Sequence, residues 1–342
     1  MDDPAAAPQH ASMPGVVYLT RGVSSAFASA LTSSDAPALD PARASEDHAA
    51  FVALLEARGR PVGGEVVEVA ADANQPDCVF VEDCVVFTPG RGIFACAPHD
   101  DRAGEVRAVV DAALSATEAR WKGFPGAAFL AGAADAAEGE RVEGGDVMYV
   151  RGGDDTRHHY FVGVGNRSNA KGAEALRRAL RVAAERSLAD GKRQKFWGTD
   201  ADPDDFDRAF KVHEIDLSDV REDWLHLKSA ITWAPYVGFV ASDAACPVYR
   251  RVAKALENAE ATAVNKIDKP CVVVPRRAAN ALWLPGNVVI AHPDAVSAVR
   301  ERGGNALDAA VACEQPELAK ADGALTCGVV VMDPFFDWGG FS

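Results

Sequence analysis

The sequence has no closely spaced pair of cysteines, so it lacks the usual signature of a disulfide framework or a structural zinc site. None of its seven cysteines falls in a Cys-x-x-Cys pair, and their number is odd. This usage is typical of reduced thiols, most of which are small core residues. The seven are Cys78, Cys84, Cys96, Cys246, Cys271, Cys313 and Cys327.

Long apolar runs and positive charge are also scarce. The most apolar region, residues 231–249, is interrupted by Pro235, Asp243 and Pro247 and therefore predicts no membrane span. The first residues are acidic and proline-rich, without the apolar segment of a signal peptide, so we expect a cytoplasmic protein. The formal charge of −15 argues against nucleic acid or an anionic membrane as a partner and suits a cationic small molecule.

One pattern recurs along the 342 residues: a polar signature, an apolar strand, a Gly or Pro turn, a second strand and a helix. The signatures occupy residues 77–83, 143–146, 225–229, 280–284 and 325–328. The apolar strands expected around the turns lie at 79–87, 93–96, 147–150, 160–163, 231–233, 237–241, 288–291 and 329–332. Helices are expected from Asp40 to Gly59, from about 101 to 121, after Asn169, along Val248 to Leu256 and from Asp294.

The last strand can pair with the first one, at residues 16–19, which would close the chain into a ring without free ends. The sequence therefore predicts an α/β protein with five strand–turn–strand–helix units around a pseudo-symmetry axis, a five-bladed β/α propeller. We expect residues 1–14 to form a disordered tail and residues 15–342 to form a single catalytic domain. Charged loop insertions are expected near residues 151–159 and 192–218.

The segment 76–83 places three carboxylates, Asp77, Glu82 and Asp83, around a short hydrophobic strand. A single acidic residue there would most simply cap a turn or face solvent. Three of them would be costly to bury unless a cation meets them, which favours a cation-binding site.

Equivalent units place their signatures at equivalent positions, so Glu143, His226 and Cys327 are expected to face one central channel with Asp77. A cysteine, a histidine and an acid that converge from distant positions can supply a thiolate, a proton shuttle and a group that orients the imidazole.

These stretches together resemble the dimethylarginine dimethylaminohydrolase family of the guanidino-modifying, or pentein, superfamily. The matching segments are Pro-Asp-Cys-Val-Phe-Val-Glu-Asp at 76–83, Glu-Gly-Gly-Asp-Val at 143–147, Phe-Val-Gly at 161–163, Asn-Arg-Ser-Asn at 166–169, Leu-His-Leu-Lys-Ser at 225–229 and Asp-Gly-Ala-Leu-Thr-Cys at 322–327. They span nearly the whole chain in the family's order, and the family has the five-bladed ring expected above.

The resemblance implies that Cys327 is the nucleophile, His226 the general acid and base, and Glu143 the acid beside it. It implies hydrolysis of methylated arginine to citrulline through a covalent S-alkylthiouronium, without a cofactor or a metal. The residues that it implies for substrate binding are Leu31 in a lid, the carboxylates Asp77, Glu82, Asp83 and Asp322, and the carboxylate-binding arginines Arg102 and Arg167. The small-molecule substrate would be the main partner of a monomer or homodimer.

Two features depart from the family. Residues 98–101, before Arg102, are Pro-His-Asp-Asp instead of an arginine-rich sequence, and Gly328 stands where the family often has a second cysteine. The sequence therefore predicts neither the residues that surround Arg102 nor any metal or redox regulation beside the nucleophile.

Other functions of the same superfamily compete with this one. Arginine and agmatine deiminases resemble each other in having an aspartate two residues after the catalytic histidine, where this chain has Lys228. We expect the Lys228 ammonium to turn to solvent and leave its methylene stem against the substrate's methyl groups. Amidino transfer shares the covalent intermediate, and a binding protein that kept the pocket is a further alternative. His158 and His159 are expected in an exposed loop, because no third ligand lies at metal spacing.

Overall fold

The computed structural model describes residues 15–32, 37–88, 91–121, 128–130, 139–151, 158–165, 167–189, 206, 210–220, 224–259 and 270–334. The predicted tail at 1–14 lies outside this part of the chain. Within it, no helix is both long enough and apolar enough to cross a membrane.

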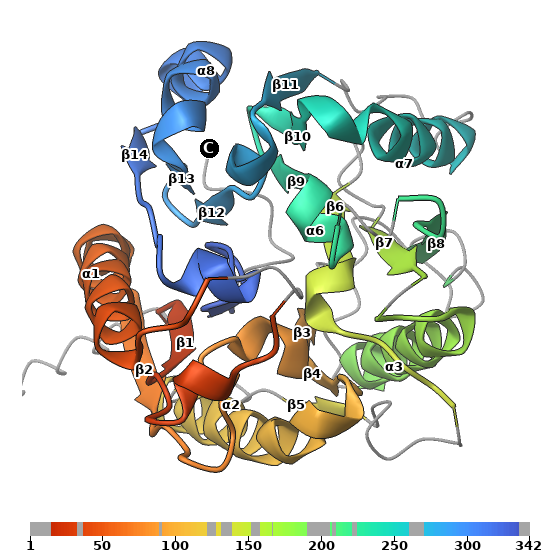
Figure 1. Cartoon of the computed structure of the whole chain (residues 1–342). Coiled ribbons are helices and arrows are strands. Elements are labelled where there is room, and N and C mark those ends of the chain that lie inside the picture. The colour runs from red at the N-terminus through yellow and green to blue at the C-terminus, as the bar shows by residue number, and fades with distance from the viewer. Residues whose placement is uncertain are drawn as a thin grey trace, which may run out of the picture.

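The described residues form five three-stranded sheets that repeat one design around a ring (Figure 1). In each sheet the middle strand pairs antiparallel with the strand before it and parallel with the strand after it. The sheets are, in ring order, β15 (Val330–Met332), β1 (Val17–Arg21) and β2 (Glu65–Val69); β3 (Val85–Thr88), β4 (Gly92–Ala95) and β5 (Ala128–Leu130); β6 (Val147–Arg151), β7 (His158–Val164) and β8 (Phe210–Asp216); β9 (Ile231–Ala234), β10 (Gly238–Ser242) and β11 (Cys271–Val274); β12 (Leu282–Leu284), β13 (Val288–Ala291) and β14 (Ala309–Ala312).

One long helix follows each middle strand and returns the chain to the parallel third strand. These helices lie on the outside of the ring in Figure 1 and are α1 (Pro41–Gly59), α2 (Val106–Arg120), α3 (Ala170–Ala189), α7 (Cys246–Ala259) and α8 (Pro293–Gly303). The short helices are α6 (Leu227–Ala230), η1 (Phe27–Ser29), η2 (Arg60–Val62), η3 (Val81–Cys84), η5 (Asp100–Glu105), η7 (Gly144–Asp146), η9 (Asp243–Ala245), η10 (Arg276–Ala278), η11 (Gly304–Ala306) and η12 (Leu318–Ala321).

Local sequence explains where the helices begin. The side chain of Asp40 accepts hydrogen bonds from the backbone N–H groups of Ala42 and Arg43 and so caps α1, whose first residue is proline. Asn169 caps α3 in the same way, since its Oδ1 accepts from the N–H of Gly172 at 2.9 Å. Both caps agree with the predicted helix starts.

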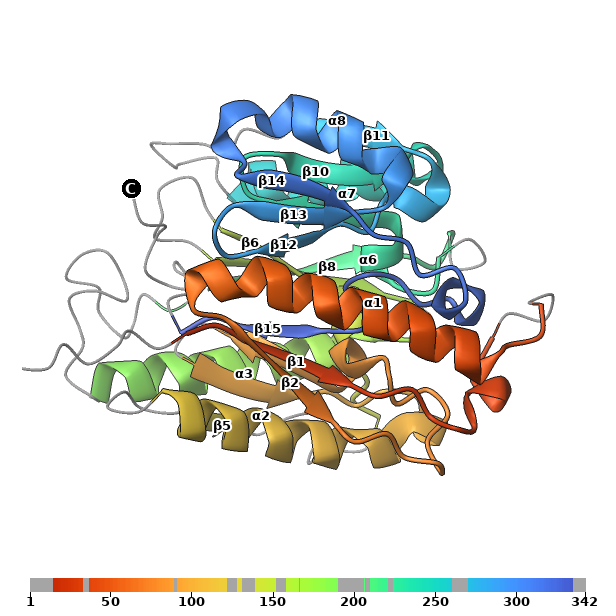
Figure 2. The ribbon, with the colours of Figure 1, turned by 90° about the vertical axis from the view of Figure 1, so that its left-hand side faces the viewer.

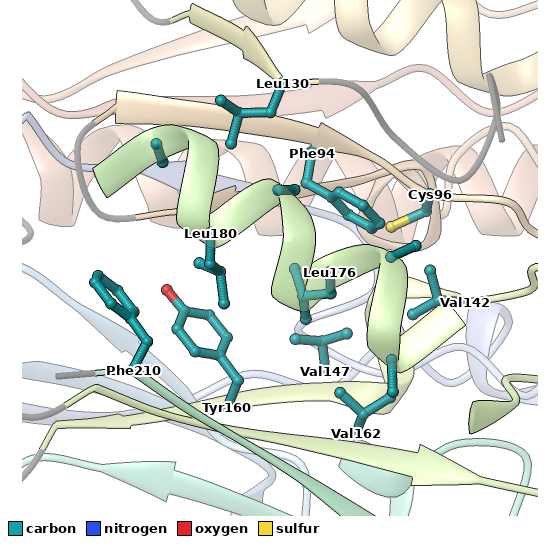
Figure 3. Packing of buried hydrophobic residues seen from close by; sticks show 14 of the residues in the cluster. Phe94, Cys96, Leu130, Val142, Val147, Tyr160, Val162, Leu176, Leu180 and Phe210 are labelled. Carbon is teal, nitrogen blue, oxygen red and sulfur yellow. The ribbon is translucent and has the colours of Figure 1, made fainter. Parts of the chain in front are cut away.

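Each junction between neighbouring sheets is filled by one apolar cluster, because both faces of the middle strands are buried. In β1, Val17 and Leu19 pack toward the β3–β5 sheet, whereas Tyr18 packs toward the β12–β14 sheet. This alternation follows from the two-residue period of a strand. Figure 3 shows another junction, where Leu176 and Leu180 of α3 pack against residues of two sheets.

The ring closes where the ends of the described chain meet. Strand β15 pairs antiparallel with β1, with Val17 opposite Met332, as the sequence predicted. Helix α1 runs along this junction in Figure 2, and its Phe51 and Leu55 pack with residues of the β12–β14 sheet and with Leu325 and Val329, which flank Cys327. Closure therefore also holds the segment around this cysteine.

The fold corrects the sequence predictions at three points. First, the third strand of every sheet was not predicted; these are edge strands of three to seven residues, and β2 alternates between exposed and half-buried residues. Second, residues 79–84 do not continue the strand, because residues 81–84 form η3 and the strand begins at Val85.

Third, the predicted loop insertions overlap two strands. Residues 158–159 begin β7 and residues 210–216 form β8, while residues 152–157, 190–205 and 207–209 lie outside the described residues. His158 and His159 are buried instead of exposed, and His159 Nδ1 lies 3.1 Å from His213 Nε2. Burial lowers the pKa of His158 and of His213 to about 3, so both imidazoles are neutral at neutral pH.

We predict that Phe51→Ala destabilises the protein by about 3–5 kcal/mol, because it leaves a cavity in the cluster that closes the ring. Urea unfolding measures the change in the free energy of unfolding. Phe129→Ala is the matched control, since Phe129 is 37% exposed on an edge strand. Equal losses in the two variants would contradict this account of ring closure.

Candidate active site

The five signatures lie together because each directly precedes the first strand of a sheet. Helix η3 precedes β3, η7 precedes β6, α6 precedes β9, Asn280 lies just before β12, and Cys327 lies just before β15. Helices η3 and η7 contact each other, as do η7 and α6. Polar residues from distant parts of the chain therefore meet at one end of the ring.

A cavity of about 360 Å³ opens among these segments. Nine of the ten predicted site residues line this cavity, and Glu82 does not. The cavity is lined by Leu31, Thr32, Asp77, Phe80, Asp83, Arg102, Glu143, Arg167, Trp224, Leu225, His226, Arg276, Ala321, Asp322, Gly323 and Cys327.

The two glycines of the Glu-Gly-Gly-Asp signature permit close packing at the site. A Cβ on Gly144 would lie 1.9 Å from the backbone oxygen of Glu82, and a Cβ on Gly145 would lie 2.7 Å from two ring atoms of His226. Either side chain would push η7 away from its neighbours. Glycine at these positions therefore lets Glu143 reach the imidazole.

His226 and Glu143 form a buried pair. His226 Nε2 lies 2.5 Å from Glu143 Oε2, and the exposed fractions of the two residues are 3% and 0%. The other carboxylate oxygen of Glu143 accepts from the backbone N–H of His99 at 2.8 Å, and Arg167 Nη1 lies 3.7 Å from it. The carboxylate is thus held in place on both sides, and it orients the ring of His226.

The His226 imidazole is stabilised in its protonated form. Burial by itself would lower its pKa, but the negative charges of Asp83, Glu143 and Asp146 outweigh that effect and raise the pKa to about 9. At neutral pH His226 is therefore an imidazolium, which can donate a proton to a leaving group.

Arg102 is held by acidic groups around it. Its Nη1 donates to Asp83 at 2.7 Å, its Nε and Nη2 donate to Glu105, and Nη2 also donates to the backbone oxygen of Phe80. Of its five N–H hydrogens, the second on Nη1 is the one for which the described residues offer no acceptor. A role in binding a substrate carboxylate would rest on that hydrogen, while the rest of the guanidinium fixes Asp83.

Asp83 connects the arginine to the imidazole. Its Oδ1 accepts from the backbone N–H of Gly145 at 3.0 Å and lies 3.8 Å from His226 Nε2. Burial opposes its charge, but His226 and Arg102 lower the pKa of Asp83 to about 2. The carboxylate therefore remains ionised although it is 2% exposed.

Lys228 corrects a sequence prediction. Its ammonium does not turn to solvent: Lys228 Nζ donates to Glu82 Oε1 at 2.5 Å, and its side chain is 15% exposed. The other oxygen of Glu82 accepts from the hydroxyl of Thr326 at 2.8 Å. Both oxygens of Glu82 are thus bonded, one to a lysine and one to a threonine, and the residue does not line the cavity.

Asp77 and Leu31 lie together at the cavity. Both carboxylate oxygens of Asp77 are 3.2 Å from the backbone N–H of Leu31. Burial raises the pKa of Asp77, although the charge of Arg102 opposes the rise. Asp322 has a left-handed backbone with φ of 57° and lies at the rim of the same cavity.

The thiol of Cys327 lies in the cavity and is 8% exposed. Burial raises its pKa well above the usual value, and the charges of Glu82 and Asp83 raise it further. Without a bound cation, Cys327 is therefore a neutral thiol. Cys78, Cys84 and Cys96 are buried as predicted, and Cys271 and Cys313 are half-buried.

Sequence reasoning missed four residues of this region. Glu105 holds Arg102, and its spacing of three residues from that arginine was a usable signal. Asp146 belongs to a recognised signature but was given no role. Trp224 and Arg276 stack at the cavity, with the Arg276 guanidinium carbon 4.8 Å from the indole centroid, and no spacing links these distant residues.

Asp83, Glu143 and His226 also present three ligand atoms within 4.8 Å of one another, which is close enough to hold a metal ion. The same atoms already bind one another, Gly145 and Arg102. A protonated imidazole is not a metal ligand. The chemistry of the group therefore suits proton transfer better than metal binding.

No protein-family model matches the chain. Solved structures do. A dimethylarginine dimethylaminohydrolase variant bound as an adduct with S-methyl-L-thiocitrulline is 22% identical over 94% of this chain and 100% of that chain, with a TM-score of 0.61. The dimethylarginine dimethylaminohydrolase of Pseudomonas aeruginosa with citrulline is 21% identical over the same shares, with a TM-score of 0.62. The fold is that of the dimethylarginine dimethylaminohydrolases.

A second enzyme of this fold is also similar. The N-terminal domain of ArgZ, a cyanobacterial arginine dihydrolase, is 14% identical over 93% of this chain and 98% of that chain, with a TM-score of 0.58. The predicted pentein fold is thus confirmed, and it is shared by proteins that act on different guanidino compounds.

We predict that the His226 imidazole titrates near pH 9, and that Asp83→Asn lowers this pKa because a stabilising charge is lost. NMR of labelled histidine, assigned with a His226→Gln variant, measures both. Since the folded-state pKa exceeds the ordinary value of 6.5, the contribution of His226 to stability is complete below pH 6.5. It is lost as the pH rises through 9. An imidazole that titrates at or below 6.5 would rule out the imidazolium described above.

Proposed function

We propose that the protein hydrolyses Nω-methylated arginine, namely asymmetric dimethylarginine and monomethylarginine, to citrulline and dimethylamine or methylamine. The observation that carries this proposal is the meeting of Cys327, the His226–Glu143 pair and the carboxylates Asp77 and Asp83 in one cavity. The solved structures of this fold add support, since they include an adduct with S-methyl-L-thiocitrulline and a complex with citrulline.

The carboxylates would bind the substrate's guanidinium. A guanidinium is flat and permanently charged, so carboxylates near its plane hold it by charge-assisted hydrogen bonds. Asp77 and Asp83 line the cavity, while Glu82 and Lys228 lie behind it as a neutralised pair. Arg167 and the remaining Nη1 hydrogen of Arg102 would bind the α-carboxylate.

The substrate cation would activate the nucleophile. The resting thiol has a raised pKa because it is buried near Glu82 and Asp83. A guanidinium bound next to it reverses the local charge and favours the thiolate, whose proton passes to solvent. Activation that depends on substrate also limits reaction of Cys327 with other electrophiles.

The thiolate of Cys327 would then attack the guanidinium carbon and form a C–S bond. The imidazolium of His226 donates its proton to the methylated nitrogen, the C–N bond breaks with its electron pair on nitrogen, and dimethylamine leaves. A cationic S-alkylthiouronium remains on Cys327 beside a neutral imidazole.

Water would complete the reaction. The neutral His226 removes a proton from water, the hydroxide adds to the thiouronium carbon, and the C–S bond breaks with its electrons on sulfur. Citrulline forms, and the second proton of the water restores the thiol or passes to the amine. His226 thus acts first as an acid and then as a base. The ionised carboxylate of Asp83 supports the acid form, since it helps to raise the pKa of His226 to about 9.

The alternative function is deimination of arginine, because the arginine dihydrolase ArgZ has a similar structure. Lys228 argues against deimination, because arginine and agmatine deiminases have an aspartate at this position. Lys228 does not line the cavity. Lys228 instead bonds Glu82, which neutralises one of the nearby acids. Amidino transfer would follow the same first half and deliver the carbon to an amine.

One assay tests the proposal. The purified protein is incubated separately with asymmetric dimethylarginine, monomethylarginine, arginine and agmatine, and citrulline and released amines are measured. We expect a higher kcat/KM for a methylated substrate than for arginine. Faster turnover of arginine would replace the proposal with deimination, and a new guanidino product formed only with an added amine would indicate amidino transfer.

We predict that Cys327→Ser lowers kcat by at least about 10³-fold, since a serine hydroxyl is far less acidic than a thiol and its attack would lack a thiolate. Cys313→Ser is the control and should keep nearly native activity, because Cys313 is half-buried away from the cavity. Mass spectrometry of the quenched reaction should place the substrate adduct on Cys327. An adduct on a different cysteine would refute this assignment.

A further inference from the structure

Asp146 occupies a position behind the His226–Glu143 pair that none of the proposed steps uses. It is 2% exposed and does not line the cavity. Its Oδ1 accepts from the backbone N–H of Leu227, the residue after His226, at 2.9 Å. Its Oδ2 accepts from the hydroxyl of Ser168 at 2.6 Å.

These contacts close a ring of hydrogen bonds through the two groups that move the proton. The oxygen of Ser168 also accepts from the backbone N–H of Glu143 at 3.0 Å, and Glu143 in turn binds His226. Asp146 therefore fixes the backbone of Leu227 directly and that of Glu143 through Ser168. Gly163 provides the space for it, since a Cβ there would lie 2.7 Å from Asp146 Oδ1.

We propose that Asp146 is a positioning residue that, with Ser168, sets the distance and alignment between His226 and Glu143. The expected effect of Asp146 on kcat rests on the proposed function, whereas its effect on the alignment of His226 and Glu143 does not. Two hydrogen bonds to backbone groups hold both partners at their attachment points, and displacements of about 1 Å in such pairs can reduce rates by 10²-fold.

Charge is the second contribution of Asp146. The charged groups near His226 are Asp83, Glu143 and Asp146, with Arg167 beside Glu143. Asp146 supports the protonated imidazole, although burial raises its own pKa to about 6. It therefore favours the acid form of His226 that the first half of the reaction needs.

The test compares Asp146→Asn, Ser168→Ala and Ser168→Thr, with Asp216→Asn as a control at the exposed last residue of β8. We expect kcat to fall about 10- to 100-fold in Asp146→Asn and Ser168→Ala, with KM changed less than about threefold, and Ser168→Thr to restore kcat because it keeps the hydroxyl. NMR should show a lower His226 pKa in Asp146→Asn.

The NMR arm needs no substrate, so it separates this inference from the proposed function. If no methylated substrate is turned over but the His226 pKa still falls, the proposed function fails and the positioning role stands. An unchanged His226 pKa in Asp146→Asn, or a loss in Ser168→Thr as large as in Ser168→Ala, overturns the inference. If Asp146→Asn does not fold, Ser168→Ala and Ser168→Thr decide the question.

Discussion

The ionised carboxylate of Asp83 is the interaction on which the rest of the site depends. It is almost fully buried, and it is stable there because Arg102 donates to it, Gly145 donates to it, and His226 lies close by. The same charge raises the pKa of both His226 and Cys327. An unpaired carboxylate at this depth would take up a proton, and the imidazole would lose support for its acid form.

Packing between the sheets of the ring positions these charges, and no separate element at the site is needed. Five apolar clusters fill the five junctions between sheets, and each sheet carries its polar segment at the start of its first strand. A close-packed junction resists rotation of one unit against the next. Distances such as the 2.5 Å contact between His226 and Glu143 are therefore set by packing between units and not by the loops alone.

Two acidic side chains that do not face the cavity are paired with basic side chains, whereas Asp77 at the cavity wall is in no such pair among the described residues. Lys228 with Glu82, and Arg102 with Glu105, neutralise acids that do not face the cavity. Asp77 keeps a carboxylate at the wall, where only a backbone N–H of Leu31 bonds to it among the described residues.

The sequence by itself determined the number of units, the closure of the first strand on the last, and most of the residues that meet at the cavity. It could do so because apolar periodicity, helix caps and turns are local signals, and because each signature keeps a fixed place before its strand. The third strand of each sheet escaped prediction, because an edge strand is stabilised by its neighbour more than by its own composition.

Only the tertiary structure decided which charges pair. Lys228 was expected to face solvent and instead bonds Glu82, and His158 was expected in a loop and instead lies in the core. Asp146, Ser168 and Leu227 meet from separate segments, as do Trp224 and Arg276. Electrostatic and hydrogen-bond partners depend on distances in space and on desolvation, and neither quantity is encoded in the spacing of residues along the chain.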